Sequence, residues 1–147
     1  MKDRSPIQSV AMLVGLVFLL VGILGFIPGI TSNYDDLKFA GHDSDAQLLG
    51  LFDTSILHNI VHLLFGVAGL AMARTWEGAR TFLLGGGLIY LVLFLYGVIF
   101  HSEKSSNWIP VNWADNILHL ALGAGLILAG LALGKEVVRR DTAAPAV

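Results

Sequence analysis

The chain has 147 residues, of which 55% are hydrophobic and 14% are charged, and its formal net charge is −2 at pH 7. A soluble domain carries about 25% charged residues, so this composition excludes an ordinary soluble domain and a disordered chain. The small net charge argues against a nucleic-acid-binding protein, which presents a basic patch. The sequence has no cysteine, which excludes disulfides, thiolate metal sites and cysteine nucleophiles.

The first long apolar segment, residues 8–28, predicts a membrane-spanning helix. About 20 apolar residues are needed to cross the hydrocarbon core of a bilayer. Pro28 and Gly29 indicate the end of the helix. A secretory signal is the competing interpretation, because Lys2 and Arg4 precede the apolar segment. The segment is longer than a typical signal core and no Ala-x-Ala-like site follows it, so we expect a retained first span.

Three further apolar segments predict three more spans, over residues 56–74, 81–100 and 113–134. The connection over residues 31–55 is polar, and we expect a solvated surface loop there. The next connection, residues 74–81, is expected to be a tight turn. Four spans with short connections predict an all-α, polytopic four-helix bundle. We expect a single membrane domain over residues 1–140 and a disordered tail over residues 141–147.

The positions of lysine and arginine predict the orientation of the spans, because basic residues gather on the cytoplasmic side. Lys38 and Lys104 lie in the first and third connections. The other basic residues lie in the two terminal segments and in the second connection: Lys2, Arg4, Arg74, Arg80, Lys135, Arg139 and Arg140. We therefore expect a multi-pass protein with both termini in the cytoplasm.

The second and fourth spans match each other when one is shifted by 57 residues onto the other. The first and third spans match more weakly, around residues 22–24 and 97–99. This pattern predicts a bundle built from a duplicated two-helix hairpin, with both copies in the same orientation. The matched polar and small residues are Ser55 with Asn112, Asn59 with Asn116, His62 with His119 and Gly66 with Gly123.

Residues 58–66 (HNIVHLLFG) and residues 112–120 (NWADNILHL) resemble the signature segments of an uncharacterised family of small four-span bacterial membrane proteins. The family is frequent in actinobacteria and is described only as a domain of unknown function. The resemblance covers roughly residues 9–134. It implies four spans in a bacterial cytoplasmic membrane, and it implies no activity.

The histidines gather toward the outer ends of the predicted spans. His58 and His62 are four residues apart and share one face of the second span, and His119 lies near the start of the fourth. His42 lies in the first connection and His101 closes the third span. We expect His62 and His119 to lie at similar depth and to face each other. Ionisable residues within a span suggest function by default.

One interpretation of these polar residues is structural. Asn59 and Asn116, together with the histidines, would form hydrogen bonds between helices. Asp115 would cap its helix by bonding back to the amide of Asn112. The protein would then be a non-enzymatic structural or interaction subunit, in contact with the lipid bilayer and with a second copy or another membrane protein.

A second interpretation is a bound metal or cofactor. The spacing of His58 and His62 lets two imidazoles chelate one ion, and His119 and Asp115 would complete a site for zinc or copper. A b-type haem held between His62 and His119 is a further alternative. The sequence does not distinguish these groups from a quinone or a lipid head group in the same place.

A small transporter or channel that acts as an oligomer is the third interpretation, although no charged residue lies at mid-membrane. Gly130 and Gly134 form a Gly-x-x-x-Gly pair, which is typical of helix dimerisation. Tyr96 is expected to approach the histidines, whereas Tyr90 is expected to be packed with its hydroxyl bonded locally. No nucleophile–base pair or complete catalytic motif is present, so an enzyme is not expected.

Overall fold

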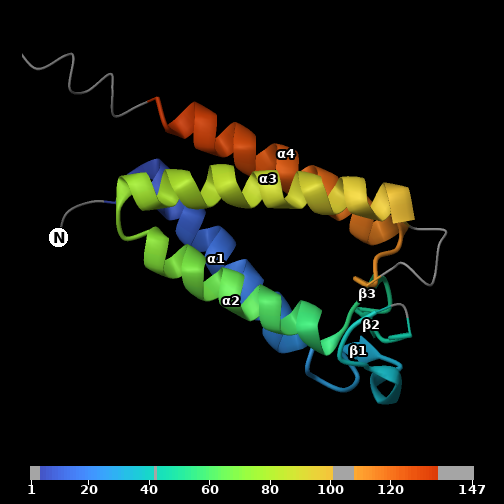
Figure 1. Cartoon of the computed structure of the whole chain (residues 1–147). Helices are drawn as coiled ribbons and strands as arrows, with labels where there is room; N and C mark the ends of the chain where they lie inside the picture. The colour runs from blue at the N-terminus through green and yellow to red at the C-terminus, as the bar shows by residue number, and fades with distance from the viewer. Residues whose placement is uncertain (1–3, 42, 101–107, 136–147) are drawn as a thin grey trace, which may run out of the picture.

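A computed structural model of the chain contains four helices arranged as two antiparallel pairs (Figure 1). It describes residues 4–41, 43–100 and 108–135. One pair is formed by α1 (Pro6–Leu24) and α2 (Ile56–Met72), and the other by α3 (Trp76–Phe100) and α4 (Trp113–Leu133). The contacts within each pair are far more extensive than those between the pairs, and α2 and α4 contact each other least.

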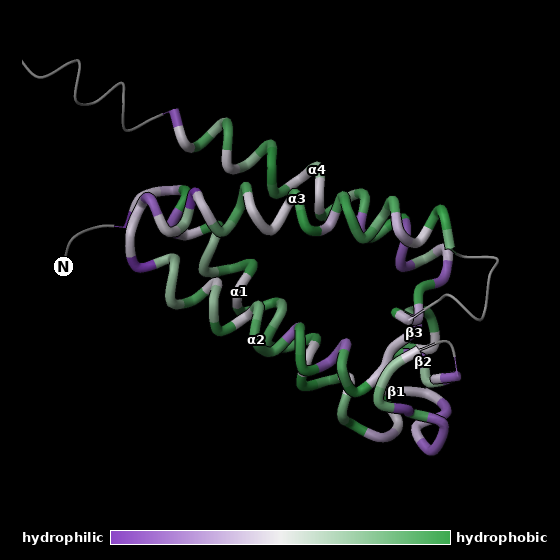
Figure 2. Tube along the Cα trace, viewed as in Figure 1, coloured by the Kyte–Doolittle hydropathy of each residue, from purple (hydrophilic) through white to green (hydrophobic). Residues whose placement is uncertain are grey.

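Within the described residues, α1, α3 and α4 are long and apolar enough to cross a membrane. The remaining helix, α2, is also apolar but has 17 residues. Figure 2 shows hydrophobic residues along the helices and hydrophilic residues mainly at the two ends of the molecule. The composition therefore separates an apolar middle from two polar ends.

Two helix ends differ from the expected spans. α1 ends at Leu24, four residues before the expected end. The hydroxyl of Thr31 lies 3.2 Å from the carbonyl oxygens of both Leu24 and the following residue, Gly25. The carbonyl groups at this end therefore have a hydrogen-bond donor outside the helix. α3 begins at Trp76, five residues before the expected start. The hydroxyl oxygen of Thr75 accepts a hydrogen bond from the amide of Gly78 at 3.0 Å, which caps the helix at this earlier position.

Some expectations fall on residues outside the described ranges. The expected disordered tail over residues 141–147 is one of them. The others concern single residues at the two ends of the chain and in the outer connections: Lys2, His42, His101, Lys104, Arg139 and Arg140.

The connection between α1 and α2 folds into a small antiparallel sheet instead of the expected surface loop. Its strands are β1 (Thr31–Ser32), β2 (Gln47–Leu48) and β3 (Phe52–Asp53), in the order β1-β2-β3. Thr31 pairs with Leu48, and Gln47 pairs with Asp53. Strands of two residues are too short to show the alternation that identifies a strand in a sequence. The sheet lies at the end of the molecule where the two helix pairs are separated (Figure 1).

Glycines allow the helices of each pair to approach closely. A Cβ added at Gly15 in α1 would lie 3.0 Å from the carbonyl oxygen of Gly66 in α2. A Cβ added at Gly87 in α3 would lie 2.9 Å from the carbonyl oxygen of Gly123 in α4. Small residues bring helix backbones together in this way within membranes. The predicted small-residue faces of α2 and α4 thus pack against the other helix of the same pair.

The Gly-x-x-x-Gly pair of α4 is also used within the chain. A Cβ added at Gly130 would lie 2.7 Å from a side-chain carbon of Leu84 in α3, and one added at Gly134 would lie 2.9 Å from Nε of Arg80. This face is covered by α3. A pattern that is typical of helix dimerisation is thus used here in packing within the chain.

Aromatic rings connect the two pairs in the buried core. The Phe65 ring of α2 lies 5.1 Å from Phe18 of α1, 5.1 Å from Phe82 of α3 and 6.0 Å from Tyr90 of α3, measured between ring centroids. Edge-on and tilted ring pairs of this kind are favourable arrangements. Phe18, Phe82 and Tyr90 belong to the buried core, so the core itself joins the pairs.

We expect Gly87→Ala to destabilise the protein, because the added Cβ would meet the backbone of α4, and overpacking of this kind costs about 1–3 kcal/mol. Gly85→Ala is a matched control in the same helix, since no atom lies within 4 Å of its added Cβ. Thermal unfolding in detergent should give a lower midpoint for Gly87→Ala and an equal or higher midpoint for Gly85→Ala, which gains helix propensity. Equal midpoints for the two variants would contradict the close packing of α3 on α4.

Candidate functional site

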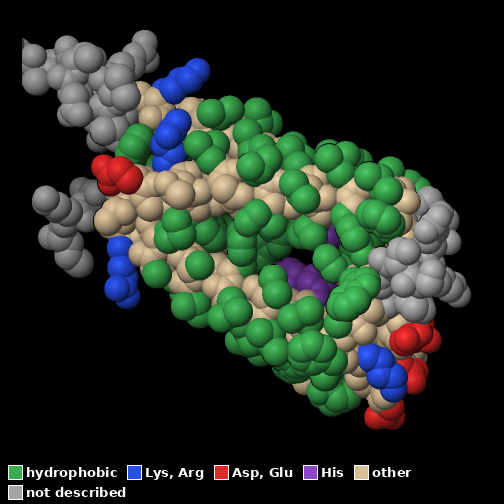
Figure 3. All heavy atoms as spheres, viewed as in Figure 1, with side chains coloured by type: hydrophobic (Ala, Val, Ile, Leu, Met, Phe, Trp, Pro, Cys, Tyr) green, Lys and Arg blue, Asp and Glu red, His purple; other side chains and the backbone are tan. Residues whose placement is uncertain are grey.

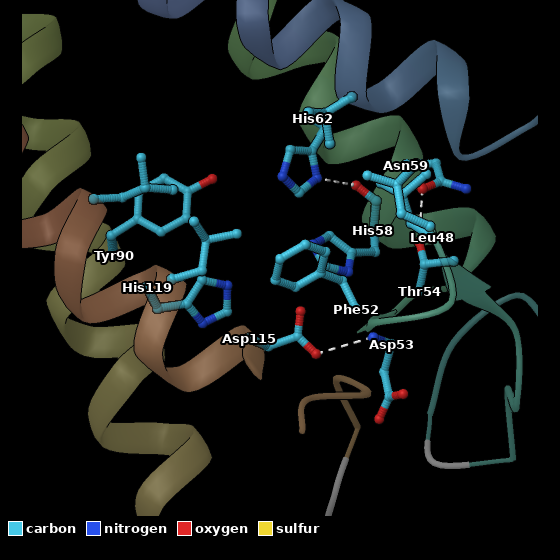
Figure 4. Close-up of a pocket in the computed structure, with 14 residues that line it drawn as sticks. Leu48, Phe52, Asp53, Thr54, His58, Asn59, His62, Tyr90, Asp115 and His119 are labelled. Atoms are coloured by element: carbon cyan, nitrogen blue, oxygen red, sulfur yellow. Dashed lines mark hydrogen bonds between the residues drawn. The ribbon is translucent and has the colours of Figure 1, made fainter. Parts of the chain in front are cut away.

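The three described histidines line a space between the helix pairs, near the end that carries the sheet. His58 and His62 come from α2, His119 comes from α4, and Tyr90 of α3 joins them. Figure 4 shows His58 and His62 on one side and Tyr90 and His119 on the other. We refer to the space between these four side chains as the histidine cleft.

Two adjoining cavities, of about 100 and 120 Å³, share all four side chains of the histidine cleft. The first also contacts α1 and the sheet, and the second contacts residues 108–110. Figure 3 shows histidine atoms inside a hollow whose rim is hydrophobic. The histidines therefore lie in largely apolar surroundings, with these apolar side chains among the neighbours: Val21, Leu48, Phe52, Val61, Leu93 and Leu122.

The ring of His62 is oriented by its own helix. Its Nδ1 lies 3.0 Å from the carbonyl oxygen of His58. Because a carbonyl oxygen only accepts hydrogen bonds, Nδ1 carries the proton, and the lone pair of the neutral ring lies on Nε2. Figure 4 shows the other ring nitrogen turned toward the side of the cleft that holds Tyr90. His62 thus presents a hydrogen-bond acceptor to the cleft.

His58 and His119 each bury an Nδ1 atom that has no hydrogen-bond partner in the described part of the chain. The ring of His58 lies 4.5 Å from that of His62, and the ring of His119 lies 5.4 Å from that of Tyr90, measured between centroids. Buried polar atoms normally have a partner, since an unsatisfied one costs about 1–3 kcal/mol. Because both atoms are almost completely buried, a bound molecule reaches them only when the rings turn toward the cavities.

Phe18 of α1 links the two sides of the cleft. Its ring centroid lies 5.4 Å from that of His62 and 5.5 Å from that of Tyr90, with the Tyr90 ring stacked at an interplanar angle of 17°. A continuous series of ring contacts therefore runs from His58 to His119 and fixes the positions of the imidazoles.

Asp115 holds the sheet against the start of α4. Its Oδ2 accepts hydrogen bonds from the backbone amides of Asn112 and Asp53, each at 3.0 Å. The amide of Asp115 donates to Oδ1 of Asn112 at 3.0 Å, and Nδ2 of Asn112 donates to the carbonyl oxygen of Leu51 at 2.8 Å. The predicted capping role of Asp115 is confirmed, and Asn112 is the residue that caps the start of α4. The bond to Asp53 was not predicted, because no sequence signal connects residues so far apart.

The two asparagines do not bond across the cleft. Oδ1 of Asn59 accepts a hydrogen bond from the hydroxyl of Thr54 at 2.7 Å, and its side chain covers Gly25 of α1. Asn116 covers Gly97 of α3, and neither of its side-chain polar atoms has a partner among the described residues. The expected hydrogen bonds of these asparagines between helices are absent from that part of the chain.

The residues expected to hold a metal are only partly brought together. His58, His62, Asp115 and His119 all line the first cavity. Within residues 4–41, 43–100 and 108–135, no group of three or more histidine and acidic side chains is arranged to hold a metal ion. A metal would therefore require these side chains to move.

Tyr90, rather than Tyr96, is the tyrosine of the cleft. The hydroxyl oxygen of Tyr96 accepts a hydrogen bond from the amide of Trp108 at 2.8 Å, and Tyr96 lines neither cavity. The sequence carries a signal for Tyr90: it lies four residues after Gly86 and seven before Gly97, on the small-residue face of the helix.

We expect Asp115→Ala to loosen the sheet, because it leaves the amides of Asn112 and Asp53 without their acceptor, at a cost of about 1–3 kcal/mol. Hydrogen exchange should become faster at the amide of Asp53 than in the wild type. Asp115→Asn is the milder control, since it retains one side-chain oxygen. Unchanged exchange at Asp53 in Asp115→Ala would show that the carboxylate does not hold the sheet.

Comparison with known proteins gives a family and no activity. A family model described as a domain of unknown function (DUF4383) matches residues 8–132. The chain therefore belongs to this family, as the resemblance of its sequence predicted. No curated protein and no solved structure was found to match the chain.

Proposed function

We propose that this member of the DUF4383 family is a membrane protein that binds a small molecule in the histidine cleft without catalysing a reaction. The observation that carries the proposal is the pair of buried Nδ1 atoms of His58 and His119, which have no partner among the described residues and lie beside two cavities with largely apolar walls. Pockets for small ligands combine apolar walls with a few polar groups in this way. A purely structural interface would be expected to pair such atoms.

We also propose that the cleft lies toward the outer face of the cytoplasmic membrane, with both termini inside. Lys38 is the described basic residue at the sheet end, where acidic side chains are also visible (Figure 3). The positive-inside rule then favours a cytoplasmic position for the opposite end. That end carries the other described basic residues, which are Arg4, Arg74, Arg80 and Lys135.

The two helix pairs are best explained as copies of one hairpin. The proposal is supported by contacts that occur in both pairs. In these contacts each residue of α1 corresponds to a residue of α3 that comes 72 positions later, as Phe18 corresponds to Tyr90. The sequence match of residues 22–24 with residues 97–99 uses a different offset. The cleft would then lie on the axis that relates the copies, which explains why matched residues from both pairs line it. The repeated contacts are Gly15 with Gly66 and Gly87 with Gly123, Gly25 with Asn59 and Gly97 with Asn116, and Phe18 with His62 and Tyr90 with His119.

Zinc or copper is a second candidate for the bound group. The bond between Nδ1 of His62 and a backbone carbonyl favours it, because imidazoles that ligate metals commonly donate their other nitrogen in this way. A b-type haem between His62 and His119 would use Nε2 of His62 and a ring nitrogen of His119. Each of these groups has a distinct signature in the purified protein.

To test binding, the full chain should be purified in mild detergent and analysed by metal measurement, visible spectroscopy and mass spectrometry of an organic extract. We expect a bound small molecule in the wild type and its loss in His119→Phe. That variant keeps a ring but removes both nitrogens, so its unfolding midpoint without ligand should be unchanged or higher.

The alternatives give different results in the same experiment. A Soret band would identify haem, and zinc or copper at one ion per chain would identify a metal site. A wild type that carries no bound group, together with a lower midpoint for His119→Phe, would contradict binding and favour the structural subunit.

A further inference from the structure

We propose that the histidine cleft binds an uncharged, lipid-soluble ring with oxygen atoms at opposite edges, of the quinone and quinol class, which enters from the lipid phase. This inference rests on the proposed function and adds to it the chemical class of the ligand and its route. Five observations support it: the charge of the lining, its two polar sides, its size, its surroundings and the turn between β2 and β3.

The lining disfavours a charged ligand. Across the described residues, neither cavity is lined by lysine or arginine, which are the side chains that recognise phosphate and carboxylate groups. The two acidic side chains at the first cavity already have partners. Asp115 accepts from two backbone amides, and Asp53 accepts from Nε2 of Gln47 at 3.0 Å. Among the described residues, the polar groups left for a ligand are the imidazoles, the hydroxyl of Tyr90 and Nδ2 of Asn59.

These polar groups lie on two opposite sides of the cleft. His58 and His62 face Tyr90 and His119 across it (Figure 4). A neutral imidazole can donate from one nitrogen and accept at the other, so each side can bond a carbonyl or a hydroxyl oxygen. A ring with oxygens at opposite edges reaches both sides at once. A fatty alcohol has one polar group and would leave one side unpaired.

Neither cavity alone reaches the volume that holds benzene, so a single substituted ring would occupy both. An apolar cavity of about 150 Å³ is large enough for benzene. The two adjoining cavities have volumes of about 100 and 120 Å³ and share the cleft residues. Phe52 and Tyr90 line the first cavity and offer aromatic faces on which a flat ring can stack.

The mouths of the cavities lie on apolar surface. Leu57 and Val61 line the second cavity and are 39% and 49% exposed, and Leu118 lines the first and is 38% exposed. All three lie on helices, where exposed apolar side chains of a membrane protein face lipid. Figure 3 shows the hollow opening through a hydrophobic surface. A ligand with an apolar tail can therefore enter sideways while its tail remains in lipid.

The backbone conformation of the turn between β2 and β3 is a separate observation in favour of an apolar ligand. Leu49 has φ 56° and Gly50 has φ 67°. Leu49, Gly50 and Leu51 connect the paired residues Leu48 and Phe52. Leucine is unfavourable in the left-handed region, which glycine and asparagine adopt more readily. Leu49 is 65% exposed and lines the first cavity. Turn geometry and core burial do not explain leucine at this position, whereas contact with an apolar ligand or with lipid does.

The test uses the full chain in phosphatidylcholine vesicles, titrated with decylubiquinone, a benzoquinone with a decyl tail, while tryptophan fluorescence is recorded. Trp108 lines the second cavity and reports on occupancy. We expect saturable quenching in the wild type and at least about tenfold weaker binding in His119→Phe, which is the loss of one or two hydrogen bonds.

Leu49→Asn separates ligand contact from folding. Asparagine suits the turn, so the unfolding midpoint should be equal or higher while affinity for decylubiquinone falls several-fold. Leu51→Asn is the matched control, because Leu51 lies in the same turn and is 53% exposed but lines neither cavity. The affinity of this variant for decylubiquinone should match that of the wild type. Wild-type affinity in Leu49→Asn would overturn the contact between this turn and the ligand.

The remaining outcomes distinguish this inference from the proposed function. If decylubiquinone does not bind saturably but the purified chain carries a metal ion or another molecule, the quinone class is wrong and the binding function stands. If decylubiquinone does not bind and the purified chain carries nothing, both are wrong.

Discussion

The close approach of helix backbones at glycine is the interaction on which the rest of this structure depends. Gly15 meets α2 at Gly66, and Gly87 meets α4 at Gly123, so each pair is tight along its length. The glycine faces of α2 and α4 are used inside the pairs, and these two helices contact each other least. Larger aromatic side chains meet between the pairs and hold them together on one side of the histidine cleft. The cleft is the space that this packing leaves.

The other side of the cleft is closed by the sheet, which depends on one carboxylate. Asp115 accepts from the amides of Asn112 and Asp53, so the same oxygen caps α4 and holds β3. Leu48 and Leu49 of the adjoining strand and turn then reach the first cavity. A capping residue thus also sets the position of part of the cavity wall, which couples the stability of the sheet to the shape of the cleft.

Much of the fold could be predicted from the sequence because its signals are local. Long apolar segments identified the helices, and Ser55 and Asn112 identified two of their starts, since capping depends on residues three positions apart. The sequence also indicated that His62 and His119 belong together. What could not be predicted is non-local: two-residue strands have no measurable period, and the bond between Asp53 and Asp115 has no signal in either segment.

The sequence also did not show which helix packs against each helix face. A stripe of small residues shows that a helix packs closely, but it does not show against which helix. Gly130 and Gly134 therefore suggested a second copy of the chain, although α3 covers them. Tyr90 was missed for a related reason. Its role depends on Phe18 and His119, which belong to two other helices.

We propose that the Nδ1 atoms of His58 and His119, which have no partner in the described part of the chain, bind a molecule between the helix pairs. The ring ¹⁵N resonances of histidine-labelled protein, recorded with and without decylubiquinone, test this binding. We expect the rings of His58 and His119 to shift on addition, while His62 keeps a protonated Nδ1 in both states. Resonances of His58 and His119 that stay unchanged at saturating decylubiquinone, with no other bound molecule in the protein, would contradict it.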